Sequence, residues 1–176
     1  MYELKNFELE GKMNSAFIYL AENFHKTGHN KKPVVSHSIM VGTTLYHCGY
    51  SDEIVIAGIL HDLIEDTDIT YDDIKNEFGE KVADIVQVVS FDDNIDNKEE
   101  QTRELFGRVK KYGYEAIVVK CADLFCNLPF FVYVKKEEVI HYLKDKYHLF
   151  IDMFDNDLKG EKLYEAYLNR CSEILN

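Results

Sequence analysis

Apolar residues recur at helical spacing along almost the whole chain, and this pattern constrains the fold more than any other feature. Phe17, Leu20 and Phe24 lie three or four positions apart within residues 13–26, the spacing that places side chains on one face of an α-helix. Turn-rich stretches such as 27–33 separate the helical segments, and the chain contains only two prolines. Because no hairpin or βαβ signal is evident, the sequence predicts an all-α fold.

Cap and turn residues set the expected helix boundaries. Ser51 is a plausible N-cap, and Thr70 with Asp73 resembles a capping box with Asp in place of Glu. Segments 114–127 and 130–134 are apolar enough to be either helix or strand, although no partner strands are evident. The other expected helices cover residues 13–26, 35–48, 51–64, 70–78, 82–89, 98–112, 137–154 and 159–175.

Length and composition predict one globular domain. The 176 residues, 46% hydrophobic, suit a single domain over 1–176, with a motif-bearing core at about 15–130 and C-terminal helices at about 135–175. No apolar run approaches the roughly 20 residues of a membrane span, and the N-terminus does not resemble a signal peptide. We therefore expect a cytoplasmic protein without a membrane partner. The oligomeric state stays open.

Cysteine usage agrees with a reducing compartment. None of the four cysteines forms a C-x-x-C pair, and four are few for a disulfide scaffold. We expect all of them to be reduced thiols in the core. They are Cys48, Cys121, Cys126 and Cys171.

The charge distribution bears on the ligand. A net charge of −12 argues against a nucleic-acid polymer as partner. Residues 23–51 nevertheless contain no acidic residue. This basic window suits a small anionic ligand, with a solvated basic loop as the alternative. Its basic side chains are His25, Lys26, His29, Lys31, Lys32, His37 and His47.

A polar cluster interrupts the apolar pattern in the stretch ILHDLIEDT, residues 59–67. On a helix His61 would stack near Glu65, and Asp62 near Asp66. Ionised carboxylates in an apolar setting need partners, and one divalent cation would supply them all. Imidazole nitrogen with carboxylate oxygen suits Mn, Fe, Co, Ni or Zn. A solvated acidic helix end is the alternative, although a helix C-terminus favours cations.

Two more candidate ligands lie in apolar helices. His37 belongs to the apolar stripe of the helix before the cluster, and Asp123 lies within VVKCADLF. Taken alone, His37 is more typical of a satisfied core histidine and Asp123 of an N-cap. Together with the adjacent His61-Asp62 pair, they favour one metal site.

The order H…HD…D resembles the HD superfamily of metal-dependent phosphohydrolases, and HD-x-x-E-D-T resembles the hydrolase domain of RelA/SpoT proteins and its small metazoan homologue. SHSIMV, DITYDDIKNEFGEKVADIVQVVS and VVKCADLFCNL are similar to further family segments in the same order. The resemblance covers about residues 15–130. It implies an HD-type helical bundle, a (p)ppGpp 3′-pyrophosphohydrolase activity and one divalent metal, with Mn as the first choice.

The resemblance also implies roles for particular residues. His37, His61, Asp62 and Asp123 would hold the metal, Glu65 and Asp66 would orient and deprotonate a water, and Asn127 matches a position that contacts the nucleotide sugar. The loop before His37 departs from the family pattern. The family arginine that stacks on the base falls at Gly28, and the next family lysine at His29. Lys31 or Lys32 would then supply phosphate contacts.

Three functions follow from these features. The first is a phosphohydrolase acting on a (p)ppGpp-like nucleotide. The altered loop leaves another nucleotide or small phosphorylated metabolite open as substrate. The third function is a non-catalytic module that binds metal or nucleotide. Such a module would be expected if one of the water-activating residues were missing.

Overall fold

The computed structural model describes residues 7–28, 33–92 and 94–175. Among these residues every regular element is a helix, so the predicted all-α class is confirmed. The chain forms two compact units, residues 1–87 and 88–176, and each is described by itself. No helix of the described residues is both long and apolar enough to cross a bilayer.

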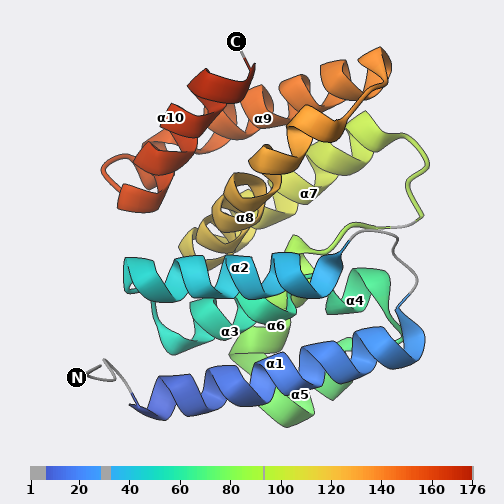
Figure 1. Cartoon of the computed structure of the whole chain (residues 1–176), viewed down its shortest axis with the longest axis vertical. Helices are drawn as coiled ribbons and strands as arrows, with labels where there is room; N and C mark the ends of the chain where they lie inside the picture. The colour runs from blue at the N-terminus through green and yellow to red at the C-terminus, as the bar shows by residue number, and fades with distance from the viewer. Residues whose placement is uncertain (1–6, 29–32, 93, 176) are drawn as a thin grey trace. The chain divides into compact units, whose positions relative to one another are not determined.

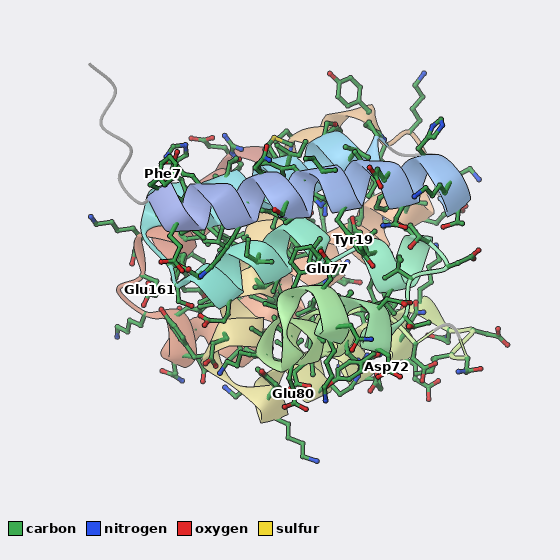
Figure 2. The ribbon with its side chains drawn as sticks, turned by 90° about the horizontal axis from the view of Figure 1, so that it is seen from below. Phe7, Tyr19, Asp72, Glu77, Glu80 and Glu161 are labelled. Carbon is green, nitrogen blue, oxygen red and sulfur yellow. The ribbon has the colours of Figure 1, made fainter. Side chains whose placement is uncertain are left out.

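The first unit is a cluster of helices around α3, which is apolar along its whole length. Every residue of α3 from Ile54 to Leu60 is buried, and α1 and α2 both pack against this helix (Figure 1). Tyr19 of α1, labelled in Figure 2, meets Phe78 of α5 edge to face with ring centroids 5.2 Å apart. The helices are α1 (Phe7–Thr27), α2 (Val34–Cys48), α3 (Asp52–Leu60), α4 (Leu63–Asp66), α5 (Tyr71–Phe78) and α6 (Glu80–Val89), the last of which ends in the second unit.

Two glycines allow α2 and α3 to approach closely. A Cβ on Gly42 would lie 2.2 Å from Cγ1 of Ile59, and a Cβ on Gly58 would lie 2.3 Å from Cδ1 of Leu45. Ile59 and Leu45 are both fully buried, so neither side chain has room to move aside. The backbones of α2 and α3 lie close together at their crossing because glycine has no side chain there.

Side-chain caps fix the starts of two helices. Ser51, the expected N-cap of α3, precedes that helix but makes no side-chain cap hydrogen bond. Thr70 accepts a hydrogen bond from the Asp73 amide, and the Asp73 carboxylate accepts one from the Thr70 amide, so the predicted capping box is confirmed. The Asp73 carboxylate also accepts a hydrogen bond from the Thr70 hydroxyl at 2.6 Å. This bond, and then the one from the Thr70 amide, lowers the pKa of Asp73. Asn97 caps α7 (Lys98–Tyr112) by accepting from the amides of Glu99 and Glu100.

The second unit packs its helices around an aromatic core. Phe150 of α9 lies 5.5 Å from Phe106 of α7, 4.7 Å from Phe154 and 5.5 Å from Tyr167 of α10, centroid to centroid. The two ambiguous segments are both helical: 114–127 is α8 and 130–134 falls largely in a 3₁₀ helix, η1. The elements are α7 (Lys98–Tyr112), α8 (Tyr114–Asn127), η1 (Leu128–Tyr133), α9 (Glu137–Leu158) and α10 (Lys162–Leu175).

Three expectations need correction. The helix expected over 51–64 is broken at His61 and Asp62, which form a turn between α3 and α4. The first helix begins at Phe7 and not at residue 13, because its first turn buries Leu9. All four cysteines are free, but Cys48 is exposed at the end of α2 and is not a core thiol.

Candidate metal and phosphate site

The turn between α3 and α4 carries the polar cluster. Asp62 precedes α4 with φ −92° and ψ −3°, and its carbonyl still accepts from the amide of Asp66 at 2.9 Å. The turn therefore interrupts the helix, while the backbone hydrogen bond that joins residues 62 and 66 is kept. His61 lies at the end of an apolar helix and is only 2% exposed.

His61 is held in one orientation by its own helix. Its Nδ1 lies 2.9 Å from the carbonyl oxygen of Gly58, and a carbonyl only accepts, so Nδ1 carries a proton. Nε2 then faces Oδ1 of Asp62 at 3.1 Å. Two neighbouring ligands of an octahedral ion with bonds of about 2.1 Å lie about 3.0 Å apart. A cation between these two atoms would satisfy both of them.

His37 brings a second imidazole to the same place. Its ring centroid lies 5.3 Å from that of His61, with the planes at 68°, and the two rings offer nitrogens within 4.8 Å of each other. His37 is 7% exposed because it projects from the buried face of α2. The donor set of His37, His61 and Asp62, two imidazoles and a carboxylate, fits a first-row divalent metal.

Glu65 and Asp66 follow on the single turn of α4. Asp66 is buried at 7% exposure, whereas Glu65 is half-buried. Thr67 ends the turn by donating from Oγ1 to the carbonyl of Leu63 at 2.6 Å. The Asp68 amide donates to the Thr27 hydroxyl at 3.1 Å, which fastens this end of α4 to α1. The two carboxylates thus lie on a short, anchored element that directly follows the His61-Asp62 turn.

Asp123 lies on α8 in the second unit and is 5% exposed. Its Oδ2 is 2.8 Å from Nζ of Lys120, and its Oδ1 accepts from Nδ2 of Asn127 at 2.6 Å. Burial, and then the negative charge of Asp123, raises the pKa of Tyr147 far above its ordinary value. Tyr147 therefore stays protonated and does not act as a base.

The structure brings together the predicted residues of the first unit, His37, His61 and Asp62, with Glu65 and Asp66 one turn further on. In the second unit it pairs Asp123 with Asn127. The predicted anion-binding residues His29, Lys31 and Lys32 lie outside the described residues. The sequence interpretation missed Lys120, although a lysine inside the apolar run VVKCAD is itself a signal, since a buried lysine needs a partner.

Comparison with known proteins places these motifs in one family. The sequence model of the HD domain matches residues 16–146. This match spans the His61-Asp62 turn and the helix of Asp123, and so it draws on both compact units.

Several curated relatives carry one activity name. Guanosine-3′,5′-bis(diphosphate) 3′-pyrophosphohydrolase MESH1 of Xenopus tropicalis is 34% identical over 125 residues, which cover 65% of this chain and 69% of the relative. The MESH1 protein of Danio rerio is 38% identical over 98 residues, 54% of each chain. A bis(diphosphate) 3′-pyrophosphohydrolase of Aquifex aeolicus is 42% identical over 80 residues, 46% of this chain and 11% of the relative. The matched region thus spans between about a tenth and about two thirds of the length of these three relatives.

Solved structures share the fold. A metazoan SpoT orthologue, described as hydrolysing ppGpp, superposes with a TM-score of 0.73 and 23% identity, over 98% of this chain and 97% of that one. The protein lmo0812 of Listeria monocytogenes gives a TM-score of 0.72 at 24% identity and covers 84% of this chain. At these identities the likeness concerns the fold alone.

Proposed function

This chain belongs to the HD domain family, and we propose that it is a metal-dependent phosphohydrolase that removes the 3′-pyrophosphate of a guanosine polyphosphate. The observation that carries the proposal is the orientation of His61. Its Nδ1 is committed to the Gly58 carbonyl, and its Nε2 faces the carboxylate of Asp62. This arrangement fixes the tautomer that a histidine needs to ligate through Nε2.

We assign four ligands to one divalent ion: His37, His61, Asp62 and Asp123. The first three belong to one unit, and the buried Asp123 carboxylate of the second unit completes the set in this proposal. We take the ion to be Mn, as the resemblance to RelA/SpoT-type hydrolases implies; Fe, Co, Ni and Zn are alternatives that the same donors suit. When bound, the ion supplies Lewis acidity, which makes a water more acidic and stabilises charge on phosphoryl oxygens.

Glu65 and Asp66 have the second role. We assign them to orient the attacking water and to take up its proton, because they follow the ligand turn directly and are partly or fully shielded from solvent.

The reaction then proceeds by attack on phosphorus. Water forms a new bond to the phosphorus attached to the ribose 3′-oxygen, the bond between that phosphorus and the 3′-oxygen breaks, and the leaving oxygen is protonated. The products are pyrophosphate and a nucleotide with a free 3′-hydroxyl. Asn127 is assigned to the sugar, and His29, Lys31 and Lys32 to the phosphates. A cytoplasmic location stays a prediction.

A different base or a smaller phosphorylated metabolite is the second candidate, and the surroundings of Gly28 favour it. A Cβ on Gly28 would lie 2.6 Å from the carbonyl oxygen and 2.8 Å from Cδ1 of Phe24. The position that matches the family's stacking arginine therefore has no space for a side chain unless Phe24 moves. A pocket of about 450 Å³ lies beside it, with Phe24, Val34 and Ile39 among its apolar lining residues. These side chains would contact a ligand through apolar surface, and they supply no guanidinium group to stack on a guanine base.

A substrate panel tests the proposal. The purified chain is freed of metal, reloaded with Mn²⁺ and incubated with ppGpp, with its adenosine counterpart carrying the same 3′-pyrophosphate, and with deoxynucleoside monophosphates. We expect pyrophosphate release from ppGpp, lost in His61→Ala. Turnover of another panel member alone would support the second candidate. A metal-loaded protein that hydrolyses none of them would contradict the catalytic assignment.

A further inference from the structure

Lys120 is a buried cation that the proposed reaction does not use. It lies on α8 among apolar residues and is only 3% exposed. Taking an ammonium group out of water is costly unless its charge is paired and its protons are hydrogen-bonded. The surroundings of Lys120 therefore show what holds this charge in place.

Three groups of the second unit fix the ammonium group. Nζ lies 2.8 Å from Oδ2 of Asp123, one turn along the same helix, and both side chains are under 10% exposed. Nζ also donates to the carbonyl of Val89 at 3.5 Å and lies 5.2 Å from the centre of the Phe91 ring. The cation is thus anchored to the segment 88–91 as well as to the carboxylate.

The segment that holds Lys120 is itself tied down. Arg108 of α7 donates to the carbonyl of Val88 at 3.2 Å and to that of Ser90 at 2.9 Å. The carbonyls on either side of Val89 therefore have a fixed guanidinium partner. As a result, the position of Nζ is set by two helices of the second unit, α7 and α8, and not by Asp123 alone.

Asp123 consequently has a donor on each oxygen. Lys120 holds Oδ2, and Asn127 donates to Oδ1 at 2.6 Å. Lys120 comes from three positions before Asp123 and Asn127 from four positions after it, so the two donors approach the carboxylate from opposite ends of the helix. Two such restraints fix both side-chain torsions of Asp123.

We propose that Lys120 is a positioning residue that holds the Asp123 carboxylate in its metal-ligating orientation. This inference rests on the proposed function, in which Asp123 is a ligand. A buried ion pair contributes little net stability compared with apolar residues of the same shape, so stability alone gives a weak reason for this pair. Groups that orient a metal ligand, by contrast, affect metal affinity directly.

The test compares two lysines that share one aromatic ring. Lys146 of α9 lies 5.1 Å from the centre of the same Phe91 ring as Lys120. Mn²⁺ affinity is measured by titration of the metal-free protein for wild type, Lys120→Met and Lys146→Met. We expect Lys120→Met to weaken Mn²⁺ binding by about 10- to 100-fold. The Lys146→Met control, which leaves Asp123 untouched, should stay within about twofold of wild type.

Two further variants separate positioning from packing. Lys120→Arg keeps a charged donor and should recover most of the lost affinity, whereas Lys120→Gln should not. Lys120→Gln takes the place of Lys120→Met if the latter does not fold. A folded Lys120→Met or Lys120→Gln protein that binds Mn²⁺ as tightly as wild type, or that loses no more affinity than Lys146→Met, would overturn the inference. If wild type itself binds no divalent ion, the proposed function fails, and this inference fails with it.

Discussion

The carbonyl of Gly58 determines what His61 is able to do. Because this carbonyl lies 2.9 Å from Nδ1, the ring is held with its other nitrogen toward Asp62. The sequence alone predicts the spacing of the polar cluster, His61, Asp62, Glu65 and Asp66. The sequence does not predict the contact between His61 and the Gly58 carbonyl. This contact depends on the backbone at the end of α3, where the chain leaves the helix one residue before Asp62.

Glu65 is the residue whose replacement separates chemistry from metal binding. Glu65→Gln keeps the size of the side chain but removes the base, so turnover should fall by about 10²- to 10⁴-fold while bound Mn stays at the wild-type level. Steady-state kinetics and metal analysis on the same preparation check this expectation. Asp68→Asn, on an exposed neighbour, is the matched control and should retain full turnover. A Glu65→Gln enzyme with wild-type turnover would rule out the role assigned to Glu65.

At the scale of elements, the crossing of α2 and α3 carries the two histidines. His37 lies five residues before Gly42, and His61 three residues after Gly58. The glycines bring the helices together, and this close approach lets the two rings meet at 5.3 Å. The periodicity of apolar residues predicted both helices, but it could not predict the distance between them, which depends on tertiary packing.

Replacement of one of these glycines should destabilise the first unit. In Gly42→Ala the new Cβ would lie 2.2 Å from Cγ1 of Ile59, and overpacking of this kind costs about 1–3 kcal/mol of unfolding free energy. Gly107 of α7 has no neighbouring heavy atom within 4 Å of such a Cβ. Gly107→Ala should therefore raise the unfolding free energy by about 0.5–1 kcal/mol, because alanine loses less backbone entropy in a helix. Urea unfolding measures both changes. An unchanged or raised stability in Gly42→Ala would contradict the packing described here.

Local signals predicted some element boundaries accurately. The capping box at Thr70 and Asp73, and the helix over 98–112 that ends at Gly113, are both where the sequence placed them. The break at His61 and Asp62 escaped prediction because the apolar spacing continues through it. The strand-like run at 117–119 proved helical because, among the described residues, no strand is available to pair with it.

At the scale of the whole molecule, the fold class and the family were predictable, whereas the proposed role of residues 29–32 in substrate binding stays a prediction. The all-α class followed from one periodicity repeated along the chain, and the HD motif agrees with the family match over residues 16–146. The loop that contains His29, Lys31 and Lys32 departs from the family pattern. We therefore argue its contribution to substrate choice from the charges of its side chains alone.

The most direct test of the central claim is a crystal structure of the chain grown with Mn²⁺, with anomalous diffraction recorded at the manganese edge. We predict one strong anomalous peak, ligated by His37, His61, Asp62 and Asp123, with Glu65 and Asp66 beside its open positions. A map with no peak between the two imidazoles, or with an ion there that Asp123 does not ligate, would contradict the account.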